Sequence, residues 1–213
     1  MLVRDRMNQP VLTIASDMPI HEALGIMKRE HIRHIPVLQD GKLVGIVANE
    51  DLVYASPSPA TSLSIWEMNF LLSKITVKEV MTKHVITVDE DTPIEDAALL
   101  MAEHKIGCIP VMRNEVLVGI ITETDLFNIF PELLAVHQTG IRATMLVKEE
   151  PGQLAKVTKV IAEHGSNFIS FVQFAGKHQD NRLVTIKVDG LTLETVQTCL
   201  EPIVEKLVDI RKK

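Results

Sequence analysis

The sequence contains few aromatic residues and few cysteines, and both shortages limit what it can form. Phe, Trp and Tyr make up 4% of the 213 residues, whereas hydrophobic residues as a whole make up 46%. The core must therefore be built from aliphatic side chains, and disorder is not expected. The two cysteines, Cys108 and Cys199, lie far apart and form no C-x-x-C pair. We therefore expect a reducing cytoplasm and no disulfide scaffold.

Further absences exclude several classes of protein. A net charge of −6 provides no basic surface of the kind that nucleic-acid phosphates require. No apolar run approaches the roughly 18–20 residues of a membrane helix, and the first ten residues lack the apolar stretch of a signal peptide. No Walker loop, G-x-S-x-G or H-E-x-x-H motif is present, so no enzyme is expected. His31 and His34 have no acidic or cysteine partner at ligand spacing, so no metal site is expected either.

The chain repeats its own sequence after 74 residues. Met7 recurs as Met81, and Asp51 recurs as Asp125, at the same spacing. A constant internal period indicates a repeated structural unit. Two copies of one small fold usually pair about a pseudo-twofold axis, and a ligand tends to bind in the crevice between them.

Each copy is predicted to fold as a β-α-β-β-α unit. A short strand precedes a helix that starts at Pro19 in the first copy and at Pro93 in the second. Apolar residues recur every three to four positions along this helix. Two strands joined by a tight turn follow, and a second helix begins near Asp51 or Asp125.

The tight turn differs between the two copies. The first has Asp40-Gly41, a strong hairpin signal between apolar runs. The second has Asn114-Glu115 at the same place and has lost the glycine. We therefore expect a longer turn, or another turn type, in the second copy.

The repeat ends near residue 138, and the remaining sequence follows another pattern. Strands are predicted at 141–147, 168–174, 183–188 and 207–211, with helices at 154–164 and 193–205. This β-α-β-β-α-β order is typical of a ferredoxin-like fold. We therefore predict an α+β protein with four parts: a first repeat at 1–55, a linker with a short helix at 56–76, a second repeat at 77–135 and a C-terminal domain at 138–213.

The repeated unit resembles a pair of CBS domains, the tandem known as a Bateman module. The resemblance rests on the I-P-V strands at 35–37 and 109–111 and on the L-V-G-I strands at 43–46 and 117–120. The C-terminal part resembles an ACT domain through E-P-G-Q-L at 150–154 and H-G-S-N-F at 164–168. The domain order and the linker are similar to those of the acetoin-utilization protein AcuB family. The resemblance implies a regulatory, ligand-sensing protein linked to acetoin catabolism. It does not indicate which protein would be regulated.

The family's nucleotide motif is Gly, two apolar residues, Ser or Thr, two variable residues and Asp. The second repeat matches it fully with Thr122 and Asp125, whereas the first has Ala48 in place of the hydroxyl residue before Asp51. A carboxylate accepts hydrogen bonds from both ribose hydroxyls, and a guanidinium binds phosphate in a bidentate manner. The resemblance implies that the regulatory ligand is an adenine nucleotide such as AMP, ADP or ATP, and no other cofactor is expected.

In this family each site takes its Asp from one repeat and its phosphate-side residues from the other, so the resemblance implies two unequal sites. The better-equipped site opposes Asp125 to a guanidinium, and its residues are Leu12, Thr13, Arg33, His34, Ile35, Pro36, Thr122 and Asp125. The weaker site opposes Asp51 to the uncharged Gly107 and Cys108. Its residues are Ala48, Asp51, Ile86, Thr87, Cys108, Ile109 and Pro110.

Simpler interpretations of these residues stay open. Asp51 and Asp125 could be helix caps and nothing more. Arg33 and His34 could be solvated ends of strands. Cys108 beside an apolar strand is typical of a buried small hydrophobic residue.

For the C-terminal domain, the resemblance implies an amino-acid site across a dimer interface. Two turns would present backbone N–H groups near one end of the sheet, through Pro151, Gly152, Gln153, Leu154, Gly165, Ser166 and Asn167. The alternative is that this domain only dimerises, since a fold alone does not fix a function. A homodimer is expected in both cases. A second hypothesis for the whole protein is a structural, dimerising interaction protein with no bound nucleotide.

Overall fold

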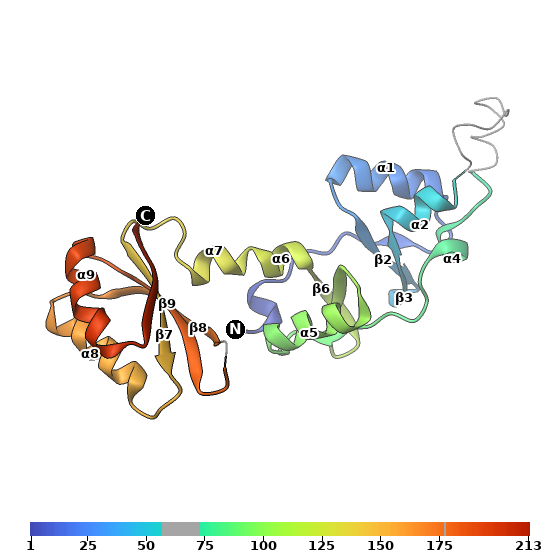
Figure 1. Cartoon of the computed structure of the whole chain (residues 1–213). Helices are drawn as coiled ribbons and strands as arrows, with labels where there is room; N and C mark the ends of the chain where they lie inside the picture. Colours follow the sequence, from blue (N-terminus) through green and yellow to red (C-terminus); the bar gives the residue numbers. More distant parts are fainter. Residues whose placement is uncertain (57–72, 177) are drawn as a thin grey trace. The chain divides into compact units, whose positions relative to one another are not determined.

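The computed structural model describes residues 1–56, 73–176 and 178–213 (Figure 1). The short helix predicted in the linker falls on residues outside these ranges. The chain divides into two compact units, Met1–Leu126 and Phe127–Lys213, and each is described here by itself. The predicted domain boundaries stay a prediction.

The first unit contains two three-stranded sheets of the same topology. In each sheet a two-residue strand runs parallel to the middle strand, which pairs antiparallel with the third. The first repeat consists of β1 (Ile14–Ala15), α1 (Ile20–Glu30), β2 (His34–Gln39), β3 (Lys42–Ala48) and α2 (Asn49–Tyr54). The second consists of β4 (Val88–Asp89), α5 (Ile94–His104), β5 (Cys108–Arg113), β6 (Val116–Thr122) and α6 (Glu123–Phe127).

The two hairpin turns have the same length and the same backbone conformation. Gln39 pairs with Lys42 in one repeat, and the equivalent pairing closes a two-residue turn in the other. Both turn residues have positive φ in each case: 52° and 75° at Asp40 and Gly41, and 47° and 66° at Asn114 and Glu115. The expectation of a longer or different second turn is therefore wrong. Asn tolerates this left-handed conformation, and the flanking strand pairs hold Glu115 in it.

The second unit has one four-stranded antiparallel sheet with two helices packed on one face. Its strands are β7 (Ile141–Lys148), β8 (Phe168–Ala175), β9 (Asn181–Val188) and β10 (Lys206–Lys212), in the order β10-β7-β9-β8. Helices α8 (Gln153–Glu163) and α9 (Leu193–Leu200) contribute Val157, Ile161, Val196 and Leu200 to its aliphatic core. A short helix, α7 (Ile129–Leu133), precedes β7. This β-α-β-β-α-β unit confirms the predicted α+β fold class.

Helix α9 is shorter than predicted. It ends at Leu200 rather than near residue 205, and a 3-10 turn, Glu201–Ile203, follows it. Pro202 lies in that turn, and proline has no backbone N–H with which to continue an α-helix.

The leading segments of the two repeats are exchanged. Helix α4 (Val77–Val80) opens the second repeat, yet Val77 and Met81 belong to the buried core of the first. Its backbone bonds to the first repeat through Val77 N–H to Met18 O (2.9 Å) and Lys78 N–H to Ser16 O (2.8 Å). The equivalent bonds, with donors 74 positions earlier and acceptors 74 positions later, run from Val3 N–H to Thr92 O (2.9 Å) and from Arg4 N–H to Glu90 O (3.0 Å). The N-terminal segment is therefore attached to the second repeat. Each core is therefore completed by the other repeat.

Two glycines make this exchange possible. A Cβ atom on Gly119 would lie 2.2 Å from Sδ of Met7, and one on Gly45 would lie 2.4 Å from Sδ of Met81. Real Cβ atoms do not approach a heavy atom so closely, so any side chain at these positions would displace a buried methionine. The glycines of the two L-V-G-I strands thus receive the methionine of the opposite repeat.

Replacing Gly119 by Ala should destabilise the protein by about 1–3 kcal/mol, the usual cost of overpacking a core. Gly25→Ala is the matched control, because a Cβ there meets nothing within 4 Å on helix α1, and it should stabilise by about 0.5–1 kcal/mol. Both are measured by urea unfolding.

The double variant Met7→Ala/Gly119→Ala tests whether contact with Met7 causes the destabilisation by Gly119→Ala. Its destabilisation should be smaller than the sum of the two single effects, because shortening the methionine removes the clash. Strict additivity would show that Met7 does not determine the cost at Gly119.

Candidate functional site

A cleft between the two repeats contains most of the residues predicted for the better-equipped site. It has a volume of about 380 Å³ and is lined by Leu12, Arg33, His34, Pro36, Thr122 and Asp125, together with Asn8 and residues near them. Two predicted residues do not line it. Ile35 is completely buried in the core of the first repeat, and Thr13 lies beside the cleft. We call this space the Asp125 cleft.

The exchanged N-terminal segment supplies one wall of the Asp125 cleft. Asn8 is fixed on β6 by reciprocal backbone bonds with Ile120, at 2.8 and 3.2 Å. The chain then continues through Val11 and Leu12 along the cleft before β1 begins. The short first strand is therefore limited to Ile14–Ala15, because Val11 and Leu12 line the cleft instead of pairing.

The carboxylate of Asp125 has both a structural role and a free oxygen. Its Oδ2 accepts hydrogen bonds from the backbone N–H of Thr122 (2.8 Å), the hydroxyl of Thr122 (2.7 Å) and the side-chain amide of Asn8 (2.8 Å). The first is the reciprocal bond of a helix capping box, so Asp125 caps its helix, as the simpler interpretation expects. Within the described residues, Oδ1 accepts no hydrogen bond.

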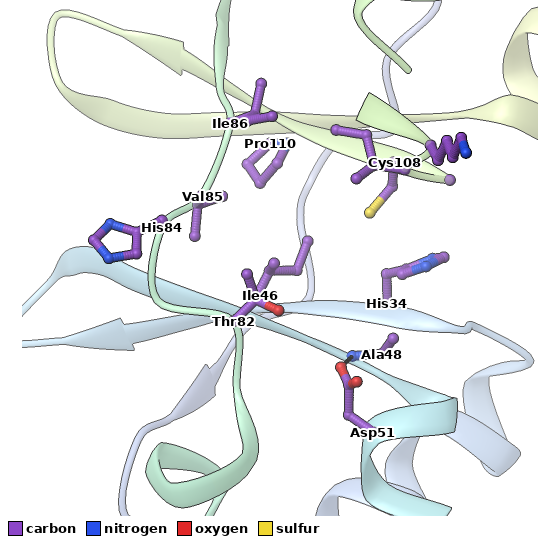
Figure 2. Close-up of a pocket in the computed structure, with 13 residues that line it drawn as sticks. His34, Ile46, Ala48, Asp51, Thr82, His84, Val85, Ile86, Cys108 and Pro110 are labelled. Atoms are coloured by element: carbon purple, nitrogen blue, oxygen red, sulfur yellow. Dashed lines mark hydrogen bonds between the residues drawn. The ribbon is translucent and has the colours of Figure 1, made fainter. Parts of the chain in front are cut away.

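A second cleft of about 270 Å³ lies around Asp51 (Figure 2). Its lining repeats that of the first cleft 74 positions away: Ile86 corresponds to Leu12, Pro110 to Pro36 and Asp51 to Asp125. Ala48 and Cys108 also line it, whereas Thr87 and Ile109 do not. Asp51 accepts a hydrogen bond from Ala48 N–H at 2.9 Å, so it too caps its helix. Figure 2 shows Asp51 and Ala48 on one side, opposite Cys108 and Pro110.

The two clefts differ in the polar groups that line them. Thr122 and Arg33 of the Asp125 cleft are replaced by Ala48 and Gly107 in the Asp51 cleft. The Asp51 cleft nevertheless has a cation, because Lys105 lines it, and the imidazole of His84 lines it as well. The sequence analysis named neither residue. Their equivalents 74 positions earlier, His31 and Pro10, line the Asp125 cleft, so the internal repeat is the signal that relates the two pairs.

His34 lies at the junction of the two clefts and lines both. Gly107 faces it, and a Cβ atom there would lie 3.3 Å from Cε1 of the imidazole. Burial lowers the pKa of His34, and the neighbouring Arg33 lowers it further, while Asp51 and Glu123 act in the opposite direction. The ring is therefore held in its neutral form at neutral pH.

Cys108 is a buried thiol. Burial, and then the charge of Glu123, raise its pKa to about 12. A thiol with this pKa is not ionised at neutral pH, and nucleophilic catalysis requires the thiolate. The geometry thus agrees with the interpretation of Cys108 as a small hydrophobic wall residue.

The two turns predicted to form one site in the C-terminal unit lie at opposite ends of its sheet. Pro151, Gly152, Gln153 and Leu154 line a cavity of about 420 Å³ beyond the end of β7, where Lys148 pairs with Asn181. Residues 165–167 precede β8, whose first residue pairs with Val188 at the other end of β9.

The expectation that the two turns lie together is therefore wrong, because helix α8 separates them. Ser166 instead donates a hydrogen bond to the carbonyl of Asp189 at 2.6 Å, and Asn167 N–H donates one to the Asp189 carboxylate at 3.2 Å. These contacts give the second turn a structural role.

Across residues 1–56, 73–176 and 178–213, no three His, Cys, Asp or Glu side chains converge as metal ligands do. No helix in these ranges is long and apolar enough to cross a membrane.

Comparison with protein families identifies the repeated unit. The model of the CBS domain matches residues 3–58 and again residues 77–132. The chain belongs to the CBS domain family. A second model, that of the TTHA0829-like ACT domain, matches residues 139–211. The predicted order of a CBS pair followed by an ACT domain is confirmed.

Several solved structures and curated proteins resemble the CBS pair. The CBS domain pair of protein MJ0100, solved in complex with 5′-methylthioadenosine and S-adenosyl-L-methionine, is 33% identical, with a TM-score of 0.51. That match covers 61% of this chain and 95% of the other. The AcuB protein of Vibrio cholerae is also 33% identical, with a TM-score of 0.53 over 64% of this chain and 95% of its own.

The L-aspartate semialdehyde sulfurtransferase of Methanocaldococcus jannaschii is 33% identical over 131 residues. This match covers 61% of the present chain but only 23% of the length of that enzyme.

The lowered pKa of His34 predicts a pH dependence of stability. Below about pH 6.5 the unfolded chain binds a proton at this histidine more readily than the folded chain does, so acidification favours unfolding. In His34→Gln this contribution is removed, and the free energy of unfolding should fall less between about pH 7.5 and pH 5.5 than in the wild type.

Urea unfolding at several pH values measures this. At about pH 8 the imidazole is neutral in both states, so the difference between variant and wild type measured there provides the baseline. Parallel curves from pH 8 to pH 5.5 would contradict the prediction.

Proposed function

We propose that this protein is a regulatory sensor whose CBS pair binds an adenosine-containing ligand in the Asp125 cleft. The proposal rests on one observation: Asp125 and Arg33 come from different repeats and line the same cavity of about 380 Å³. A carboxylate suits the ribose diol, and a guanidinium suits a phosphate. A ligand that contacts both would span the two repeats.

The geometry of Asp125 supports recognition of a ribose. Three hydrogen bonds fix Oδ2 in place, so the carboxylate is oriented before any ligand arrives. Preorganisation of this kind reduces the entropy lost on binding. Leu12, which is 36% exposed, and Val11 offer apolar contact for a base in the same cleft.

The solved relative supports the adenosine part of the proposal. Both ligands in the complex of the MJ0100 CBS pair, 5′-methylthioadenosine and S-adenosyl-L-methionine, contain adenosine, and neither contains a phosphate. We therefore propose adenosine as the shared element of recognition. Phosphate binding by Arg33 is a separate proposal with its own test.

Binding would regulate by favouring one arrangement of the two repeats. A ligand shifts such an equilibrium only by its difference in affinity for the two arrangements, typically about 1–3 kcal/mol. In this proposal the ACT domain forms a homodimer, or binds an amino acid in the cavity lined by Pro151 to Leu154, and passes the signal on. A role in acetoin catabolism stays an expectation from the AcuB resemblance.

The alternative is a protein in which both domains only build a dimer. Thermal unfolding with and without adenosine, 5′-methylthioadenosine, S-adenosyl-L-methionine, AMP and ATP distinguishes the two. A ligand at about 100 times its Kd should stabilise the folded state by about 2.7 kcal/mol. The absence of stabilisation by all five compounds at millimolar concentration would favour the alternative.

Asp125→Ala should weaken adenosine binding about 10- to 100-fold, because it removes a charge-assisted contact of about 1.5–3 kcal/mol. Asp51→Ala is a closely matched control: both carboxylates accept a hydrogen bond from a helix N-cap N–H, at 2.8 and 2.9 Å, so both variants lose a cap. The control should bind nearly as well as the wild type in calorimetry. Equal losses in two folded variants would show that the Asp125 cleft is not the primary site.

Arg33→Ala should weaken ligands in proportion to their phosphate content. ATP and AMP should lose affinity, whereas adenosine and 5′-methylthioadenosine should bind as before, because they offer no phosphate to the guanidinium. Calorimetry at one ionic strength measures this, since exposed phosphate contacts are screened by salt. Unchanged affinity for AMP and ATP in a folded variant would show that Arg33 does not bind phosphate and is a solvated residue at the end of a strand.

A further inference from the structure

Three cations stand in a row across the sheet of the C-terminal unit. Arg142 on β7 pairs in register with Arg211 on β10 and, on its other side, with Lys187 on β9. Residues directly opposite each other in adjacent strands project from the same face, and like charges so placed destabilise a sheet. The sheet therefore maintains an arrangement that is electrostatically unfavourable.

The row lines a cavity. Arg142, Lys187 and Arg211, with Lys213, Leu134 and Val136, enclose a volume of about 410 Å³ that we call the basic cleft. It lies where β7 begins and β9 and β10 end, away from the cavity beside Pro151. It is as large as the Asp125 cleft, at about 380 Å³.

The protein neutralises this charge incompletely. The carboxylate of Asp209 accepts a hydrogen bond from Arg142 at 3.1 Å and forms an ion pair with Arg211 at 2.6 Å. Within the described residues, the side chains of Lys187 and Lys213 form no ion pair. One carboxylate thus contacts the two arginines of the cleft and neither of its lysines, so positive charge remains there.

The side chain of Lys187 is buried and fixed by hydrogen bonds. It is only 1% exposed, and its ammonium group donates to the carbonyl oxygens of Ala135, at 2.8 Å, and of Gln138. Burial lowers its pKa, and the charges of Lys213 and Arg142 lower it further. The two carbonyls explain why Lys187 is tolerated, but they do not explain why three more cations converge beside it.

We propose that the basic cleft binds a small metabolite with at least two negative charges, carried by phosphate or carboxylate groups. The planar donors of Arg142 and Arg211 suit the oxygens of either group, and the exposed ammonium of Lys213 adds charge without demanding one geometry. Leu134 and Val136 provide an apolar wall for the carbon skeleton. Such a ligand would complete the neutralisation that Asp209 begins. The site is independent of the adenosine site.

The test is calorimetry and thermal unfolding of the full chain with pyrophosphate and, separately, with citrate, at constant ionic strength. We expect saturable binding of at least one, and the stronger of the two identifies phosphate or carboxylate as the preferred group. Arg142→Gln should weaken it at least tenfold. Lys213→Gln, which alters an exposed residue and should not affect folding, should weaken it several-fold.

Two control variants make the result specific. Arg182→Gln removes an arginine that pairs with Glu149 at 2.6 Å near the opposite end of the sheet, and it should bind as the wild type does. Arg33→Ala removes the cation of the Asp125 cleft and should also bind normally. No saturable binding of either anion at about 10 mM would overturn the proposal. So would equal weakening by Arg182→Gln, or a loss confined to Arg33→Ala.

Discussion

The sulfur atoms of Met7 and Met81 lie within 2.4 Å of the points where a Cβ would stand on Gly119 and Gly45, and each methionine comes from the other repeat. This reciprocal contact anchors the exchanged segments, because it is accompanied by paired backbone bonds at Ile46–Thr82 and at Asn8–Ile120. The chain that leaves each anchor becomes a wall of one cleft. Without the exchange, the residues at 10–12 and 84–86 would not lie between the sheets, and neither cleft would have its present lining.

The pseudo-twofold arrangement gives two clefts of the same construction, and substitutions at equivalent positions make them chemically different. Thr122 and Arg33 give the Asp125 cleft a hydroxyl and a guanidinium, whereas Ala48 and Gly107 remove the corresponding groups from the Asp51 cleft. The absence of a side chain at Gly107 also provides the space into which His34 points. The imidazole therefore borders both clefts and forms a shared wall between them.

Much of the fold could be predicted from the sequence because its signals are local or periodic. The 74-residue period predicts two equal units, and the alternation of apolar residues predicts the order of strands and helices. The resemblance to CBS pairs predicts that Asp125 and Arg33 line one cleft.

The exchange of segments could not be predicted, because the backbone hydrogen bonds from Val3 to Thr92 and from Val77 to Met18 join residues far apart in sequence. The two turns of the ACT domain were wrongly placed together because their positions depend on the path of the helix between them, and Lys105 lies outside the motifs on which the site prediction rested. The cationic row of the basic cleft also depends on strand register between residues far apart in sequence, which composition and local pattern do not define.

The exchanged segments have a consequence for how such a protein could arise and fold. In a polypeptide with one repeat, the space beside the glycine of the L-V-G-I strand would be empty. The leading segment of a second copy, with its methionine, could fill that space. Duplication and fusion of such a self-complementary dimer would turn an intermolecular association into an intramolecular one, so that assembly no longer depends on protein concentration. In the fused chain the leading segment of the first repeat is synthesised before the second repeat. It cannot pack in its final position until the last strands of the second repeat exist. The two halves must therefore mature together rather than in turn.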